Sequence, residues 1–449
     1  MKDIYEMLNE MEKNKDYKKK IDDANKEATQ AIIDARPVLL DVKPAIEVLP
    51  GMKNNMVLHS GPPIDWVDVN DLAKKAAISG ALHEGLCKNP EEGAEMFEDG
   101  RIIYDSAHHH GCFGSLGGIY TASTQVFVVK NKTHGNYSFT HLHEGNRFDR
   151  LIFGVYNDAV RDNLNWIRNI LGPGLGATIK ESGEIDLISM ISRSLKSGDE
   201  CHSRGSAGTA IFAKTIMPFI LKANLSNDRK IEIAEFIDKN DQFAVYIYMA
   251  AFKAIADAAH GFKYSTIVTA FSTNSRVFGL RVSGLGNKFP PYRWFTCPVP
   301  EKVVRGRVFT GYTLDDVVRI GGDSATIDSM GAGSSAMAAA PGLGDYAGGK
   351  FKEMLKITKM FEKITVTKNH NLLIPILDFK GASTGIDIRK VVEYRLEPLV
   401  NAGLAYKNGG HIGAGMFPAP LDVFCMALQA MYESLKEESI RRNGFREKG

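Results

Sequence analysis

The spacing of apolar residues changes twice along this 449-residue chain, and that change restricts the fold more than any other feature. Short apolar runs indicate strands, whereas apolar residues three or four positions apart indicate one face of a helix. Strands are expected at residues 56–58, 125–129, 151–155, 266–271 and 277–282, and helices at 70–84, 334–340 and 388–395. Residues 157–260 show helical spacing almost throughout. The pattern predicts a multi-domain protein of the α+β (mixed α/β) class, in which two α/β regions flank a central helical domain.

The same criterion divides the chain into four segments. Fifteen of the first 27 residues are charged, and Ile4, Leu8 and Met11 recur at helical spacing, so a charged helical arm is expected over residues 1–36. The segments after it are expected to be an α/β domain (37–156), a helical domain (157–261) and a second α/β domain with glycine-rich anion-binding turns (262–449). No repeat of roughly 20 to 50 residues is present, which excludes a solenoid or propeller.

Charge and cysteine content exclude several classes of function. The chain has 55 basic and 53 acidic residues, so no overall positive field favours nucleic acid or an anionic membrane. Its five cysteines lie far apart, which argues against a disulfide framework and for a reducing compartment. The longest stretch without charged residues, 106–129, contains three histidines and several Gly and Ser, so it is no membrane span. We expect a cytoplasmic protein that binds neither nucleic acid nor membrane.

Glycine is more frequent than usual, at 43 of 449 residues against a typical share of about 7%. Many of these glycines stand beside polar residues in four glycine-rich clusters, at 108–118, 198–205, 321–335 and 378–415. Such turns can direct backbone N–H groups toward an anion. We therefore expect the four clusters to converge on one site for a small anionic substrate.

The second and third clusters contain residue types that acyl or phosphoryl chemistry needs. Glu200, His202 and Arg204 combine an acid, an imidazole and a guanidinium, and a carboxylate can orient an imidazole while arginine grips an anion. Asp323 and Ser324, followed by Gly331, Gly333 and Ser334 at a predicted helix start, resemble an anion cradle. Helix caps, close helix packing and surface ion pairs are the structural alternatives for the same residues.

Basic residues near the fourth cluster add further candidates. Asp387, Arg389 and Lys390 open a predicted helix, where the helix dipole disfavours the two bases, so Arg389 is expected to have another partner. Arg276 and Arg281 lie five positions apart near one strand, so they point to opposite faces and at most one of them can face a given site.

A metal site is the main alternative to an anion site. His108 and His110 could share one face of an extended segment, as could His141 and His143, with Glu144 beside them. Zinc takes about four such ligands in tetrahedral geometry. The preferred interpretation has no metal and no cofactor, and a metal-dependent amidohydrolase stays as the alternative.

Several stretches of this chain resemble the YlbE-like family. The most specific are Gly-Asp-Ser-Ala at 322–325 with Met-Ala-Ala-Ala-Pro at 337–341, and Leu-Asp-Phe at 377–379 with Gly-Ile-Asp-Ile-Arg-Lys-Val-Val at 385–392. The stretches 58–64 and 281–286 add to them. The resemblance covers about residues 33 to 428.

The resemblance implies a subunit of a carbamoyltransferase. The implied enzyme converts oxalurate and phosphate into oxamate and carbamoyl phosphate in the anaerobic catabolism of purines and allantoin. It also implies an FdrA-like partner subunit and a third protein. A homo-oligomer and a non-catalytic scaffold subunit both remain open.

Carbamoyl transfer needs a phosphate pocket, a grip for the substrate carboxylate and a proton carrier, but no cofactor. We expect His109 or His202, supported by Glu200, to carry the proton, and Arg204 or Arg389 to hold the carboxylate. Phosphate is assigned to the helix start at Gly331, Gly333 and Ser334 with Ser324. The wider set of candidate substrate-binding residues comprises Arg281, Asp323, Asp387 and Lys390.

Overall fold

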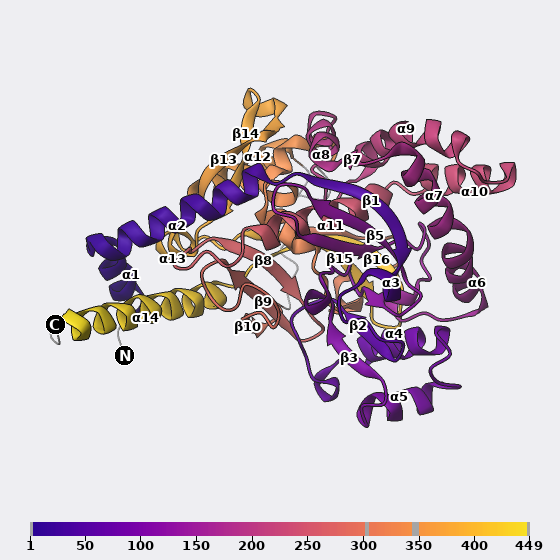
Figure 1. Ribbon diagram of the computed structural model, residues 1–449, viewed down its shortest axis with the longest axis horizontal. Coiled ribbons are helices and arrows are strands. Elements are labelled where there is room, and N and C mark those ends of the chain that lie inside the picture. Colours follow the sequence, from indigo (N-terminus) through magenta and orange to yellow (C-terminus); the bar gives the residue numbers. More distant parts are fainter. Residues whose placement is uncertain (1–2, 301–304, 344–349, 447–449) are drawn as a thin grey trace.

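The computed structural model describes residues 3–300, 305–343 and 350–446. Helices and several small sheets are interleaved in one body, from which a helical extension projects (Figure 1). The mixed α/β class predicted from the sequence is confirmed. No described helix is long and apolar enough to cross a membrane.

The first half of the chain supplies two sheets. One has the order β6-β5-β1-β7 and the other β3-β2-β4. Their strands are β1 (Pro37–Pro44), β2 (Met56–His59), β3 (Ile103–Ser106), β4 (Ile119–Tyr120), β5 (Gln125–Asn131), β6 (Tyr137–His141) and β7 (Ile185–Asp186). Strands β1 and β5 run antiparallel, with Pro37 opposite Asn131.

The second half supplies three more sheets, with the orders β10-β9-β8, β11-β16-β15-β12 and β13-β14. Their strands are β8 (Val268–Thr273), β9 (Val277–Val282), β10 (Phe295–Pro298), β11 (Arg305–Val308), β12 (Val317–Val318), β13 (Thr365–Ile374), β14 (Lys380–Ile386), β15 (Leu399–Tyr406) and β16 (His411–Pro418).

The helices are distributed along the whole chain. They are α1 (Ile4–Lys13), α2 (Lys15–Asp34), α3 (Ala45–Val48), α4 (Asp71–His83), α5 (Pro90–Glu98), α6 (Asp158–Trp166), α7 (Gly172–Ser182), α8 (Leu187–Lys196), α9 (Ser206–Lys222), α10 (Asn227–Asp238), α11 (Phe243–Ala258), α12 (Phe351–Ile364), α13 (Ile388–Tyr394) and α14 (Leu421–Arg446). Short 3₁₀ helices include Ala107–His110, Leu151–Phe153, Ser324–Ser329 and Gly333–Ala339.

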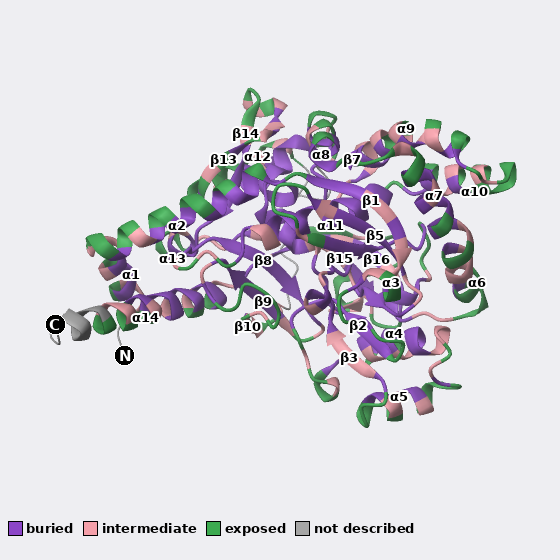
Figure 2. Ribbon diagram, in the orientation of Figure 1, coloured by how far each residue is buried: buried purple, intermediate pink, exposed green. Residues whose placement is uncertain are grey.

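Helix α11 lies at the centre of the molecule (Figure 2). Every residue from Phe243 to Ala256 is buried, and all but Lys253 are apolar. A helix that is apolar on all sides is stable only inside a core. One side of α11 contacts β5 and β6. The helix therefore sets the position at which the loop after β6 begins.

The N-terminal segment forms α1 and α2, and α1 packs against α14 (Figure 1). Met7, Leu8 and Met11 are the buried residues of α1. Arg389 of α13 bonds to Glu12 at 2.7 Å and to Asp22 at 3.2 Å. The arm is therefore tied to the last third of the chain by apolar burial and by ion pairs.

Local signals located several elements well. Helix α4 begins after Asn70, whose side chain accepts a hydrogen bond from the backbone N–H of Ala73, and β9 and α13 lie where predicted. The predicted strand at 151–155 is wrong, because Leu151–Phe153 forms a 3₁₀ turn that ends at Gly154 with φ +70°. The Glu144 carboxylate accepts hydrogen bonds from the backbone N–H groups of Leu151 and Ile152. These bonds hold the turn, and they replace the strand-to-strand hydrogen bonds that a β-strand would make.

Candidate functional site

A pocket of about 170 Å³ opens between α11, the β15–β16 hairpin and the loop after β6. All four glycine-rich clusters contribute to its wall, which agrees with the expected convergence. It is lined by Ser115, Leu116, His143, Asn146, Arg150, Phe153, His202, Ser203, Gln242, Val245, Tyr246, Met249, Ser324, Asn401, Ala402, Gly403, His411 and Ala414. The lining has one arginine, three histidines and no carboxylate, so the pocket suits an anion.

Arg150 is the fixed charge of this pocket, and its side chain is nearly buried at 6% exposure. Its guanidinium carbon lies 4.6 Å from the centre of the Phe153 ring, which supports it from one side. Its Nε is buried without a hydrogen-bond partner, and no described carboxylate pairs with it within 4.0 Å. The buried Glu144 carboxylate interacts with Arg150 electrostatically from beyond that distance, and the guanidinium still has an N–H group without a hydrogen-bond acceptor.

His143 places a second donor beside Arg150. Its Nδ1 accepts the backbone N–H of Gly145 at 3.0 Å, so in the neutral ring the proton resides on Nε2. Burial, followed by the charge of Arg150, holds the pKa of His143 well below its ordinary value, so the ring is neutral at pH 7. Nε2 of His143 lies 3.5 Å from Nη1 of Arg150. Two donors thus face each other without an acceptor, and an anion oxygen would satisfy both.

His411 stacks on the Phe153 ring, with centroids 5.4 Å apart. Burial, and then Arg150, lower the pKa of His411 to about 4. This imidazole is therefore also neutral at pH 7, and it adds a polar group to the pocket without a charge.

His202 faces the same pocket and is bonded to Asp328. Its Nδ1 lies 3.2 Å from the Asp328 carboxylate, which is fully buried. Burial lowers the pKa of His202, but the Asp328 carboxylate and Glu200 outweigh it and bring the pKa above the ordinary value. Sequence reasoning had expected Glu200 as the partner. Instead, Glu200 accepts the backbone N–H groups of Ser203 and Arg204.

Glu200 is a buried carboxyl with an unusual pKa. Burial, and then the charge of Asp199, raise that pKa to about 7. Asp199 in turn accepts the backbone N–H groups of Cys201, Gly205 and Gly208, and so holds the loop before α9.

The raised pKa of Glu200 predicts a specific pH dependence of stability. Between its ordinary and its folded pKa, the folded state holds a proton that the unfolded state releases, so stability rises as the pH falls from about 7 toward 4.5. A Glu200→Gln variant lacks this titration. The free energy of unfolding of wild type minus that of E200Q should increase by up to about 3 kcal/mol between about pH 8 and about pH 5. Urea unfolding at both pH values measures it, and an unchanged difference would contradict the assignment.

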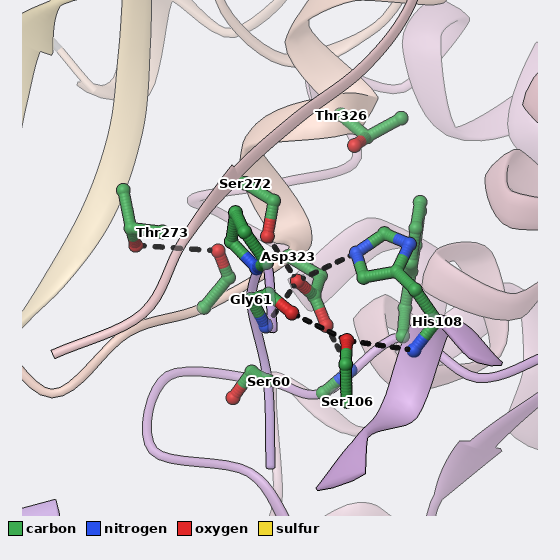
Figure 3. A network of polar contacts seen from close by, with 12 residues as sticks. Ser60, Gly61, Ser106, His108, Ser272, Thr273, Asp323 and Thr326 are labelled. Atoms are coloured by element: carbon green, nitrogen blue, oxygen red, sulfur yellow. Dashed lines mark hydrogen bonds and ion pairs between the residues drawn. The ribbon is translucent and has the colours of Figure 1, made fainter. Parts of the chain in front are cut away.

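Asp323 occupies a buried network beside the pocket (Figure 3). Its carboxylate accepts the N–H groups of Gly61 at 2.8 Å and Gly114 at 2.6 Å, together with the Ser272 hydroxyl, and it lies 3.0 Å from Nε2 of His108. Burial lowers the pKa of His108 to about 4. Four protein donors fill the acceptor positions of this carboxylate. The predicted substrate-binding residue Asp323 thus joins the first and third clusters to each other.

Two of the predicted residues line the pocket, namely His202 and Ser324. The backbone N–H groups of the third cluster already have partners, since Gly333 donates to the Glu200 carbonyl at 2.7 Å and Ser334 to Asp328 at 2.6 Å. Gly331 has φ +95° and lies against Thr384. Arg204 donates to the Gly198 carbonyl at 2.8 Å. None of these four residues lines the pocket.

The other predicted residues lie away from the pocket lining. His109 bonds to Asp105 at 2.8 Å, and the fully buried Arg281 bonds to Asp257 at 2.6 Å. Arg389 is engaged by Asp387, Glu12 and Asp22. This ion pairing supplies the partner that its unfavourable place near a helix start had suggested. Lys390 donates to the Thr365 carbonyl at 2.6 Å.

The histidines considered as metal ligands have separate partners. His110 bonds to the Pro50 carbonyl and to Asp105, and His141 bonds to the Ser115 hydroxyl at 2.9 Å. Within residues 3–300, 305–343 and 350–446, no three His, Cys, Asp or Glu side chains are grouped so that they could hold a metal ion. These histidines are therefore held apart by separate partners in the described part of the chain.

Sequence reasoning missed Arg150 and Asp328. Asp328 had a signal, because it is the only charged residue between Asp323 and Asp345. Burying a single carboxylate in a stretch of small residues costs free energy, so such a carboxylate needs hydrogen-bond partners. No sequence signal marked Arg150, because Arg147 stands in the same loop. Only the tertiary structure shows that Arg150 is buried and that Arg147 is exposed.

The amino-acid sequence of this chain is similar to those of known proteins. The family model described as oxamate carbamoyltransferase subunit AllG matches residues 102–324. The chain is 36% identical over 419 residues to the oxamate carbamoyltransferase subunit AllG of Escherichia coli K12, covering 92% of this chain and 98% of the relative. It is 40% identical over 412 residues to the uncharacterized protein YahG of the same organism, covering 91% and 85%.

A solved structure shares the fold. The crystal structure of a conserved protein of unknown function from Enterococcus faecalis V583 superimposes with a TM-score of 0.88 at 38% sequence identity. The match covers 92% of this chain and 97% of that chain.

Proposed function

Because this chain belongs to the family of the oxamate carbamoyltransferase subunit AllG, we propose that it is a subunit of a carbamoyltransferase of the same type. The reaction is the conversion of oxalurate and phosphate, or of a related ureido or amide substrate, into oxamate and carbamoyl phosphate. The enzyme works in the cytoplasm with an FdrA-like subunit and a third subunit, in the anaerobic catabolism of purines and allantoin.

The observation that carries the proposal is the pair of unmatched donors at Arg150 and His143. Oxalurate and oxamate each have one carboxylate, and a carboxylate oxygen can accept from both groups at once. The neutral state of His143 and His411 leaves one positive charge at this end of the pocket, which matches one carboxylate. Ser203, Gln242 and Asn401 line the remainder and suit the amide end of such a substrate.

The atoms of the reaction balance without a cofactor. A phosphate oxygen attacks the carbamoyl carbon of oxalurate, and the bond from that carbon to the oxamate nitrogen breaks. Hydrogen phosphate loses one proton and the leaving nitrogen gains one. His202 lines the pocket and is the residue that we assign to carry this proton.

Ligand-induced stabilisation of the purified chain tests the proposal. Oxamate, oxalurate and carbamoyl phosphate should each raise the melting temperature, because a ligand at about 100 times its Kd adds about 2.7 kcal/mol to the folded state. Oxamide, which has an amide in place of the carboxylate of oxamate, is the matched control and should have no effect. The partner subunits are then added, and carbamoyl phosphate formation from oxalurate and phosphate is measured.

The other candidate functions give different results in the same experiment. A non-catalytic scaffold subunit would be stabilised by none of the three anions, and its pocket variants would leave the activity of the complex unchanged. A metal-dependent amidohydrolase would lose activity with a chelator and regain it with zinc. Either result would contradict the proposal.

A further inference from the structure

Asp328 joins three of the four glycine-rich clusters at one carboxylate. It contacts His202 of the second cluster at 3.2 Å, the backbone N–H of Ser334 of the third at 2.6 Å, and Asn401 of the fourth at 3.0 Å (backbone) and 3.1 Å (side chain). The side chain of Asp328 has no exposed surface. These four donors fill the acceptor positions of the carboxylate, so it has none left for a substrate.

The backbone around Asp328 is shaped for this contact. Gly333 has φ +56°, and a Cβ atom there would stand 2.1 Å from Oδ1 of Asp328 and 3.3 Å from the side chain of His202. No other residue fits at this distance. The glycine of the third cluster thus allows the close approach of the chain to Asp328.

The contact determines which nitrogen of His202 is free. A carboxylate can only accept, so Nδ1 of His202 carries a proton in both the neutral and the charged ring. Nε2 has no hydrogen-bond partner among the described residues, and the ring lines the pocket. In the neutral ring, Nε2 therefore offers a lone pair to the pocket.

We propose that Asp328 is a positioning residue, which holds His202 so that its Nε2 carries the proton from hydrogen phosphate to the leaving amide nitrogen. This inference rests on the proposed function. Nε2 accepts the proton that hydrogen phosphate loses as the new C–O bond forms. It donates that proton to the oxamate nitrogen as the C–N bond breaks. Asp328 stabilises the charged ring between the two transfers.

The first test is independent of catalysis. In the wild-type chain with ¹⁵N-labelled histidine, the neutral ring of His202 should be protonated at Nδ1, and the His202→Gln variant identifies its signals. His143 provides the internal contrast, because its neutral ring should be protonated at Nε2. A neutral His202 protonated at Nε2 would overturn the inference, whether or not the chain is a carbamoyltransferase.

The second test uses the complex with its partner subunits. Asp328→Asn keeps the shape of the side chain but lets an amide donate to Nδ1, which forces the other tautomer. The kcat should fall by about 100-fold or more with a small change in KM for oxalurate, and the pH profile should lose the limb that reports His202. The exposed Asp315→Asn is the matched control and should leave kcat unchanged.

The double variant D328N/H202Q separates positioning from a merely structural role. If Asp328 acts through His202, the double variant should be no slower than His202→Gln alone. Additive losses, or a raised KM with an unchanged kcat and pH profile, would overturn the inference. A wild-type complex that forms no carbamoyl phosphate would instead refute the proposed function. The NMR experiment would still test whether Asp328 sets the protonated nitrogen of His202.

Discussion

Replacing Arg150 by methionine is expected to weaken the binding of oxamate by about 30-fold or more, because the anion loses its one buried, charged donor. Loss of one partner of a buried charge pair typically costs about 2 to 5 kcal/mol. Arg150→Lys should recover part of the affinity, since an ammonium keeps the charge but loses the planar contact with Phe153. Isothermal titration calorimetry with oxamate measures both variants.

The same variant is expected to change the stability of the free chain in the opposite direction. Wild-type Arg150 is buried without a carboxylate partner among the described residues, so its removal should raise the free energy of unfolding by about 1 kcal/mol. Arg147→Met, in the exposed part of the same loop, should alter neither oxamate affinity nor stability. Undiminished oxamate binding by Arg150→Met would contradict the assignment of Arg150 to the substrate carboxylate.

Replacing Asp323 by alanine is expected to destabilise the fold by about 3 to 5 kcal/mol, because it leaves buried donors without an acceptor. Those donors come from Gly61, from His108 and Gly114 of the first cluster, and from Ser272, which are three separate parts of the chain. Urea unfolding measures the loss. Ser272→Ala removes one donor and keeps the carboxylate, so it should cost only about 1 kcal/mol.

The result for Asp323 also separates a structural from a substrate-binding role. A structural Asp323 predicts a large loss of stability with oxamate affinity retained in the folded fraction. A variant that keeps wild-type stability and loses oxamate binding would show that the carboxylate contacts the ligand instead.

Much of the fold followed from local signals in the sequence. The Asn70 cap marks the start of α4, and the short, mostly apolar run 277–282 marks β9, because caps and short apolar runs act within a few residues. The β15–β16 hairpin was harder to detect. Its glycines at 403, 413 and 415 resemble turns, although all three pair within the strands.

The gathering of the clusters followed from the sequence only in part. The sequence indicated that polar glycine-rich turns would lie together, and His202 and Ser324 do line one pocket with members of all four clusters, while the anion stays a prediction. It did not indicate the partners. His202 and Asp328 are 126 positions apart, and Arg389 and Glu12 are 377 apart, so no spacing rule connects either pair.

The sequence by itself determined the class of fold, the family, and the residue types that could carry an anion chemistry, because each depends on composition, local periodicity or short motifs. The tertiary structure decided which of those side chains are already satisfied. Asp323 and Arg389 are saturated by other parts of the chain, whereas the buried Arg150 has an Nε without a hydrogen-bond partner. Whether a polar group is free to bind a ligand depends on desolvation and on distant partners, and both arise only when the whole chain has folded.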